Sequence, residues 1–338
     1  MQALVYKGPK TIYVESMNIP EVKRGEALVR VFYAGICGSD MHIYHGVHPR
    51  AKAPLIMGHE FCGEVVDIND EDNNVKIGDM VVPEPLLFCG KCHACLTGNY
   101  HVCYNLGLLG IDRDGGFAEY AAVPVSKLHK IPKDMSKVDA AIIEPVAVAV
   151  HTVRMSRLKI GDDVVIMGAG PIGTLVAEAC KTAGAKQIIM TDVKEDRIQK
   201  ARERDFMVIN SLKENLVEKI MDLTNGKGAD IVFDVAGVEA TAAIDTKLVR
   251  VRGQIVVVAV FNDPPRVNYR DVSFKEIDIV GVRVYNFEDY DMAINLVYNK
   301  KINVSNIVTH IFNLDEGEKG FKVMESGNGM KVLFKLND

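Results

Sequence analysis

Hydrophobic and polar residues follow two different patterns along this chain. Up to about residue 145, short runs in which apolar and polar residues alternate are separated by turns rich in Gly, Pro, Asn and Asp. Typical runs lie at 27–35 and 61–68, and the polar stretch 69–74 follows the second run. Alternation with a period of two is the pattern of half-buried β-strands. We therefore predict a β-rich unit over residues 1–145, with a turn at 69–74.

From about residue 160, apolar runs of strand length alternate with segments of helical periodicity. The runs lie at 163–168, 186–192, 230–237, 254–260 and 278–284, and the first two helical segments at 171–185 and 194–205. Near-continuous apolar runs are typical of buried parallel strands, and their alternation with helices indicates a doubly wound sheet. We therefore expect an α/β protein with a Rossmann-type domain over 146–285. The mixed pattern returns after it, so 286–338 should complete the first domain.

Composition and charge narrow the class of protein. The chain has 338 residues, 48 % of them apolar and 25 % charged, which suits a globular protein of roughly two domains. A net charge of −5 with pI ≈ 6.0 favours neither nucleic acid nor an anionic membrane as partner. The N-terminus does not resemble a signal peptide, and no apolar run approaches the ~20 residues that span a bilayer. Seven cysteines, an odd number, favour the reducing cytoplasm over a secreted disulfide framework.

A glycine-rich motif predicts a dinucleotide site. It follows an apolar strand, opens a helix and reads Gly168, Ala169, Gly170, Pro171, Ile172, Gly173. In such a turn the second glycine lets a pyrophosphate approach the positive N-terminus of the helix. Asp192 ends the next strand, where a carboxylate accepts ribose hydroxyls and repels a 2′-phosphate, so we expect NAD rather than NADP. Arg197 either stacks on the adenine or is a solvated helix residue.

Four cysteines within fifteen residues form the second motif, which consists of Cys89, Cys92, Cys95 and Cys103. Four thiolates complete a tetrahedral site without an open position, which is typical of a structural zinc. His93 and His101 lie inside the loop and are bystanders if all four thiolates bind. A redox-labile disulfide cluster is the alternative.

A third group has the donor types of a catalytic zinc site. Cys37, His59 and Glu60 supply sulfur, nitrogen and oxygen, and together they leave a coordination position open. Glu144 interrupts an apolar stretch, and a buried carboxylate requires a partner or a metal. It is a fourth ligand, a group that exchanges with zinc-bound water, or only an acid at a helix N-terminus. Cys37 taken alone also fits an ordinary core thiol.

The order of these motifs resembles the zinc-dependent medium-chain dehydrogenase/reductase family, and within it the polyol branch of sorbitol, butanediol and threonine dehydrogenases. The motifs are C-G-S-D-x-H, G-H-E, C-x2-C-x2-C-x7-C, E-P and G-x-G-x-x-G, and they extend over essentially the whole chain. The resemblance implies a GroES-like β-barrel catalytic domain at 1–145 and 286–338, interrupted by the NAD-binding domain at 146–285. It also implies two zinc ions per chain and a homo-oligomer, either a tetramer or a dimer.

The resemblance also implies roles for single residues. Cys37, His59 and Glu60 match the catalytic ligands, whereas Glu144 stands where simple alcohol dehydrogenases have a third-ligand cysteine. Which of the two carboxylates binds zinc more persistently stays open. Ser39 takes the hydroxyl position of the family's proton relay. The solvent end of that relay falls on His42.

The resemblance leaves the substrate less certain than the reaction. Arg283 falls where polyol relatives have an arginine near the substrate, and Arg50 lies in a cationic loop between two ligand motifs. Two such cations would suit a carboxylate, which favours a sugar acid of the gulonate or galactonate type. Alternatively, Arg50 is only a solvated residue of that loop. The alternatives are a polyol, a butanediol or threonine as substrate. Less favoured readings are a zinc-free reductase of the superfamily and a non-catalytic NAD-binding scaffold with structural zinc only.

Overall fold

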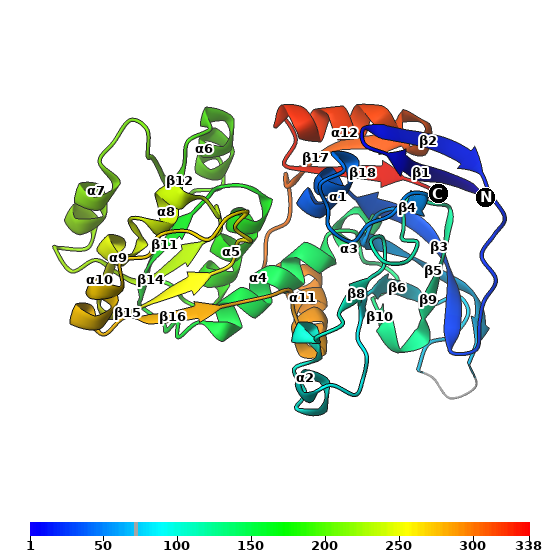
Figure 1. The fold of residues 1–338 in the computed structure, drawn as a ribbon, viewed down its shortest axis with the longest axis horizontal. Coiled ribbons are helices and arrows are strands. Elements are labelled where there is room, and N and C mark those ends of the chain that lie inside the picture. Colours follow the sequence, from blue (N-terminus) through cyan, green and yellow to red (C-terminus); the bar gives the residue numbers. More distant parts are fainter. Residues whose placement is uncertain (71–73) are drawn as a thin grey trace. The chain divides into compact units, whose positions relative to one another are not determined.

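The structure, a computed structural model, describes residues 1–70 and 74–338 and divides into two compact units (Figure 1). Unit 1 comprises Met1–Pro145 and Asn286–Asp338, and unit 2 comprises Val146–Tyr285. The predicted turn at 69–74 falls largely outside the described residues. The boundary between the units at Pro145 and Val146 lies within the helix α4 (Ile143–Met155). Among the described residues, no helix is both long and apolar enough to cross a membrane.

Unit 1 is built around a central antiparallel strand, β3 (Glu26–Gly35). Its sequence is almost entirely apolar and most of its side chains are buried, because β3 pairs with β5 (Glu60–Asn69), β9 (Tyr120–Pro124) and β18 (Lys331–Lys335). β18 belongs to the C-terminal segment of unit 1. This segment therefore completes the sheet that the N-terminal segment begins.

The remaining elements of unit 1 are short. The strands are β1 (Gln2–Gly8), β2 (Thr11–Ser16), β4 (Leu55–Ile56), β6 (Met80–Pro83), β7 (Leu86–Leu87), β8 (Gly107–Leu108), β10 (Leu128–Lys130) and β17 (Val308–Asn313). The helices are α1 (Gly38–Tyr44), α2 (His93–Leu96), α3 (Lys137–Ala140), α11 (Phe287–Tyr298) and α12 (Gly317–Ser326), with 3₁₀ turns η1 (Tyr100–Val102), η2 (Val125–Lys127) and η3 (Leu314–Glu316).

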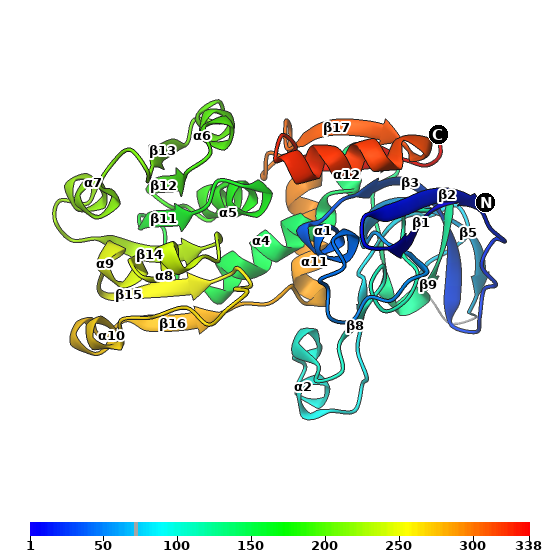
Figure 2. The same cartoon turned by 45° about the horizontal axis from the view of Figure 1, so that its top comes forward.

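Unit 2 is the predicted doubly wound domain. Its strands are β11 (Asp163–Met167), β12 (Gln187–Asp192), β13 (Met207–Asn210), β14 (Ala229–Asp234), β15 (Val249–Val257) and β16 (Asp278–Gly281). All neighbouring pairs are parallel, in the order β13-β12-β11-β14-β15-β16 (Figure 2). The helices are α5 (Pro171–Thr182), α6 (Glu195–Arg202), α7 (Leu216–Leu223), α8 (Glu239–Ala242), α9 (Asp245–Leu248) and α10 (Tyr269–Lys275). The expected fold class is confirmed.

Alternation along the parallel strands places a hydrophobic core on each face of the sheet. Val165 and Met167 lie on one face with Leu216 and Ile220 of α7, in a cluster of fully buried side chains. Val164 and Ile166 are also completely buried. They belong to the opposite face, because successive side chains of a strand point to alternate faces of the sheet. Burial on both faces explains why these strands show no polar alternation in the sequence.

Some predicted boundaries differ from the structure. The strand predicted at 278–284 ends at Gly281, and Val284 then adopts φ 45°, a conformation that a β-branched residue rarely takes. The run predicted at 254–260 belongs to a strand that begins at Val249 and ends at Val257, which leaves Val260 89 % exposed. Sequence analysis also missed the short strand β13 at the edge of the sheet.

Candidate functional site

Strand pairing brings the three residues of the predicted catalytic site together. Gly35 at the end of β3 lies directly opposite Glu60 at the start of β5. Cys37 comes two residues after Gly35, and His59 comes directly before Glu60, so both lie next to this pair. A ligand atom from each of Cys37, His59 and Glu60 lies within 4.8 Å of the others. His59 and Glu60 are buried, and Cys37 is half-buried at the N-terminus of α1.

A buried aspartate organises this group. Asp40, which is fully buried, accepts hydrogen bonds from the Cys37 N–H at 2.8 Å and the Gly58 N–H at 3.4 Å. Its Oδ1 lies 3.8 Å from His59 Nδ1. Burial acts to lower the pKa of His59, but Asp40 and Cys37 outweigh it and hold this pKa well above its ordinary value.

The donor set fits a zinc ion. His59 Nδ1 is buried and makes no hydrogen bond within the described part of the chain, although buried nitrogens are normally satisfied. Thiolate, imidazole and carboxylate are the donors found at catalytic zinc sites that keep one position open. This arrangement therefore has the composition and spacing that a metal requires.

The structure also locates the other residues predicted for this site. Glu144 lies in the first turn of α4 and is 7 % exposed. In the described residues it is not part of the 4.8 Å group, although its charge acts on His59. Ser39 and His42 both lie on α1, one turn apart and therefore on the same side of the helix, with Ser39 half-buried and His42 exposed.

Sequence analysis missed a further residue at this centre. Lys331, at the start of β18, donates hydrogen bonds to both oxygens of Glu60, at 2.7 and 2.5 Å. The signal available in the sequence was a lysine directly before an apolar strand, which by itself does not distinguish a buried lysine from a solvated one.

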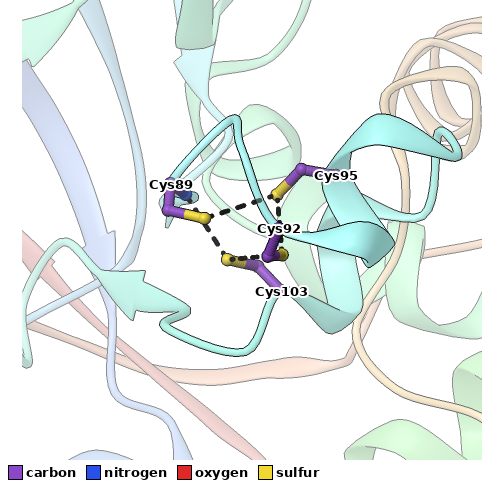
Figure 3. A group of neighbouring side chains, drawn as sticks. All are labelled: Cys89, Cys92, Cys95 and Cys103. Carbon is purple, nitrogen blue, oxygen red and sulfur yellow. Dashed lines mark hydrogen bonds between the residues drawn. The ribbon is translucent and has the colours of Figure 1, made fainter.

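The four predicted cysteine ligands converge in one loop, and none forms a disulfide (Figure 3). Their sulfurs are 3.5 Å apart between Cys92 and Cys95, 3.8 Å between Cys92 and Cys103, and 4.0 Å between Cys89 and Cys95. A Zn–S distance of about 2.3 Å would place the sulfurs of a tetrahedron about 3.8 Å apart. The backbone N–H groups of Cys95 and Tyr104 lower the pKa of Cys92 to about 6, whereas burial and the neighbouring thiols raise the pKa of Cys95 to about 12.

In unit 2, the glycine motif lines a cavity of about 710 Å³ together with Asp192 and Arg197. Gly168 has φ 114°, and a Cβ on Gly173 would come within 1.9 Å of the Gly168 carbonyl oxygen, so both positions require glycine. Pro171 is the first residue of α5, and Ile172 follows it at the cavity wall. Sequence analysis missed the rest of the wall, which includes Ser211, Leu212, Val238 and Thr241.

Asp192 holds the turn in place. Its Oδ2 accepts the Ala169 N–H at 2.8 Å, and its Oδ1 accepts the N–H groups of Val193 and Lys194 at 2.8 and 2.9 Å. Arg197 Nη1 lies 3.7 Å from the same carboxylate. The predicted ribose-binding carboxylate and its arginine neighbour are therefore both at the cavity wall.

The two arginines predicted to contact substrate have different surroundings. Arg283 is exposed and directly precedes the strained Val284. The Arg50 guanidinium donates to the Leu106 carbonyl oxygen and forms an ion pair with Asp112 at 3.1 Å.

Comparison with known proteins identifies the family. Residues 23–133 match the alcohol dehydrogenase GroES-like domain, and residues 171–299 match the zinc-binding dehydrogenase family. The chain is 36 % identical over 339 residues to a 2-dehydro-3-deoxy-L-galactonate 5-dehydrogenase of Pseudoalteromonas atlantica, covering 100 % of this chain and 99 % of the relative. It is 35 % identical to a sorbitol dehydrogenase of Halalkalibacterium halodurans, covering 98 % of each chain.

A solved structure agrees with these relatives. The crystal structure of 2R,3R-butanediol dehydrogenase from Bacillus subtilis superposes with a TM-score of 0.93 at 32 % identity, covering 99 % of both chains. The predicted combination of a GroES-like domain with a Rossmann domain is confirmed. The chain therefore belongs to the zinc-dependent medium-chain dehydrogenase/reductase family and is an alcohol or polyol dehydrogenase.

Proposed function

We propose that this enzyme transfers a hydride between NAD and a secondary hydroxyl of a sugar acid or polyol, with one catalytic and one structural zinc per chain. The observation that carries the proposal is the convergence of Cys37, His59 and Glu60 within 4.8 Å. These three residues would hold the catalytic zinc, which when bound supplies a Lewis acid that acidifies a substrate hydroxyl. Cys89, Cys92, Cys95 and Cys103 would hold the structural zinc.

The residues of α1 provide a route for the proton that the substrate loses. Ser39 is half-buried two positions after Cys37, and His42 is exposed one helical turn later. The Ser39 hydroxyl would accept the substrate proton at Oγ and release its own hydroxyl proton towards His42, whose imidazole would take up one proton and release another to solvent. A histidine suits this last step because its imidazole can take up a proton on one ring nitrogen and release one from the other.

The surroundings of Asp192 support NAD as the cofactor. Its carboxylate lies at the cavity wall beside the glycine motif and would accept ribose hydroxyls. A 2′-phosphate would place negative charge against that carboxylate, and Arg197 offsets only part of the repulsion because it already pairs with Asp192. The ratio of kcat/KM for NAD to that for NADP tests this choice, and a ratio below one contradicts it.

The sugar-acid preference rests on one relative and one residue. The relative that acts on a 2-dehydro-3-deoxy-galactonate shares 36 % identity over the whole chain. Arg283 is exposed and available to a carboxylate, whereas Arg50 is engaged by Asp112 and is the weaker candidate. Polyols, butanediol and threonine are the alternative substrates.

A substrate panel tests the proposal. NAD-linked activity should be measured with hexonates and their 2-dehydro-3-deoxy forms, with polyols, with diols and with threonine. The highest kcat/KM should belong to a sugar acid. A neutral polyol, a diol or threonine preferred over every sugar acid would rule out the carboxylate specificity. No NAD- or NADP-linked activity with any secondary alcohol would rule out the reaction itself.

We also propose that the enzyme is cytoplasmic and forms a homodimer or a homotetramer. None of the seven cysteines forms a disulfide, as expected in a reducing compartment. β16 is an edge strand with Ile279 41 % exposed, and the neighbouring α10 carries Phe274, which is 78 % exposed. An exposed apolar edge of this kind is suited to pairing with a second copy. Light scattering coupled to size-exclusion chromatography tests the assembly.

A further inference from the structure

Unit 2 has a second cavity, of about 330 Å³, at the edge of the sheet opposite the glycine motif. Lys159 and Asp162 of its wall precede β11, and Asp230 is the second residue of β14. These positions are at the N-terminal ends of the strands, whereas Gly168 follows β11 and Asp192 ends β12 at the other edge. The cavity is therefore separate from the candidate dinucleotide site.

Positive charge dominates the wall of this cavity. Four cationic side chains line it against two carboxylates, which leaves two net positive charges, although the whole chain has a net charge of −5. The cations are Arg157, Lys159, Arg250 and Arg252, and the acids are Asp162 and Asp230. This excess is close to the charge of a phosphate group near neutral pH, with opposite sign.

An irregularity of β15 brings two of these arginines to the cavity. Between two successive pairs with β14, β15 advances five residues, from Val249 to Gln254, whereas β14 advances only two. The extra residues of β15 include Arg250 and Arg252, and a bulge of this kind re-aims the side chains that it carries. Arg252 also has φ 56°, a conformation that residues other than glycine rarely adopt.

Two of the arginines have carboxylate partners that an anion can replace. Arg157 pairs with Asp278, and Arg252 pairs with Glu276 at 3.4 Å, but each of these four side chains is more than half exposed. Neither acid lines the cavity. Exposed ion pairs contribute little to stability, so both guanidinium groups can turn to a ligand at small cost.

Two donors in the wall have no acceptor among the residues that the structure describes. Gln254 is only 5 % exposed, and its Oε1 accepts the Arg157 N–H at 2.7 Å. This bond fixes the orientation of the amide and leaves the Gln254 Nε2 group without a partner at the cavity wall. Lys159 Nζ likewise forms no ion pair within the described residues. A buried amide donor is normally satisfied, so Gln254 indicates a ligand with acceptor oxygens.

We propose that this cavity binds a phosphate group, either as free phosphate or on a small phosphate ester. Gln254 Nε2 and Lys159 Nζ donate to its oxygens, and the guanidinium groups of Arg157 and Arg252 supply further donors and charge. Guanidinium groups suit the oxygens of a phosphate, and a tetrahedral anion accepts from several sides, whereas a carboxylate presents two oxygens in one plane. The volume lies at the lower end of the roughly 300–1,000 Å³ of small-molecule sites, which suits a small ester.

Isothermal titration calorimetry of the zinc-loaded enzyme tests the proposal. The enzyme is first saturated with NADH, so that phosphate cannot occupy the glycine motif, and is then titrated with inorganic phosphate, glucose 6-phosphate or citrate. At least one of the two phosphate compounds should bind at one site per chain with a Kd of about 1 mM or lower. Tighter binding of glucose 6-phosphate supports a phosphate ester as the ligand, and tighter binding of inorganic phosphate supports the free anion.

Variants locate the bound phosphate. Lys159→Gln and Gln254→Leu should each weaken binding about tenfold, because a hydrogen bond to a charged group is lost. Lys159 is exposed and without an ion pair in the described chain, so Lys159→Gln should fold even if Gln254→Leu does not. Lys133→Gln is the matched control, since it removes the same charge from an exposed position of unit 1 and should bind phosphate as the wild type does.

Several outcomes would overturn the inference. Wild-type affinity for phosphate in Lys159→Gln would contradict it, and so would an equal loss in Lys133→Gln. Binding of phosphate only in the absence of NADH would place the anion at the glycine motif instead. Citrate bound more tightly than both phosphate compounds would rule out the phosphate specificity, and no saturable binding of either compound at about 10 mM would rule out the site.

Discussion

The side chains of the candidate zinc centre are held by residues that bind no metal. Gly58 has φ 89°, and a Cβ there would meet the ring of Phe117 at 2.5 Å, so the turn before His59 accepts only glycine. The Gly58 N–H also donates to Oδ1 of Asp40, and Oδ2 of the same carboxylate accepts the N–H of Cys37. Asp40 thus connects the backbone before His59 with the backbone of Cys37. At the scale of single residues, the geometry of the centre thus depends on small and buried neighbours as much as on the ligands.

Ser39→Ala tests the proton route on α1. Removal of the hydroxyl should lower kcat for alcohol oxidation about 100-fold, because the proton acceptor at Oγ is lost. Zinc content and NADH affinity should remain as in the wild type, since Ser39 belongs to neither binding group. Steady-state kinetics with parallel metal analysis make the measurement. Full activity in Ser39→Ala would show that the proton leaves by another path.

Asp245 provides a pH-dependent test of stability. It is 4 % exposed, and burial, reinforced by Asp234 and opposed by the Thr246 N–H, raises its pKa to about 6. Unfolded, its pKa is about 3.9. The folded protein therefore holds this proton more tightly, and its stability falls as the pH rises from about 4 to 6.

Asp245→Asn should remove that decline. We expect the variant to be more stable than the wild type at pH 7.5 by on the order of 1 kcal/mol after allowance for solvent screening, with little difference near pH 4. Urea unfolding at both pH values measures it. A difference between variant and wild type that does not change with pH would argue against a perturbed carboxyl at this position.

At the scale of elements, the loop Cys89–Cys103 has little regular secondary structure of its own. Its helical pieces, α2 and η1, are only four and three residues long. Two buried residues attach it to the rest of the unit, since the Tyr100 hydroxyl donates to Glu84 at 3.3 Å and Lys127 Nζ lies 4.8 Å from the centre of the Tyr100 ring. Such short helices are not stable alone, so the four cysteines must supply much of the order of the loop.

Cys95→Ser tests the structural zinc at this scale. The zinc content should fall from two ions to one per chain, and limited proteolysis should cut within 89–103 at least tenfold faster, because the loop loses its metal cross-link. Cys180→Ala is the control and should retain both zincs, since Cys180 is fully buried on α5 of unit 2 and belongs to neither ligand group. An unchanged zinc content in Cys95→Ser would mean that the cysteines do not form a metal site.

At the scale of the whole molecule, the two kinds of chemistry belong to different units. The candidate metal ligands lie in Met1–Pro145, and the cavity beside the glycine motif lies in Val146–Tyr285. Each unit has its own buried core, so damage to one centre should leave the other folded.

Cys37→Ser tests this separation. The catalytic zinc should be lost and alcohol oxidation should fall below detection, whereas the affinity for NADH should change less than twofold. Metal analysis and the fluorescence of bound NADH give the two readouts. A loss of NADH affinity greater than tenfold would show that the cofactor site depends on the metal centre.

The sequence by itself determined the features that are local. The four cysteines and the glycine motif each lie within fifteen residues or fewer, and the chemistry of such groups follows from residue type and spacing alone. Apolar runs likewise predicted the parallel strands, because burial on both faces leaves a continuous pattern.

Only the tertiary structure decided which distant residues share a centre. The sequence left open which of Glu60 and Glu144 binds zinc more persistently, and the pairing of Gly35 with Glu60 brings a ligand atom of Glu60 within 4.8 Å of those of Cys37 and His59. Lys331 lies 271 positions from Glu60 and belongs to no recognisable motif, so its contact with Glu60 depends on the pairing of β18 with β3. Contacts of this kind arise from strand register over long sequence separations, which local patterns do not encode.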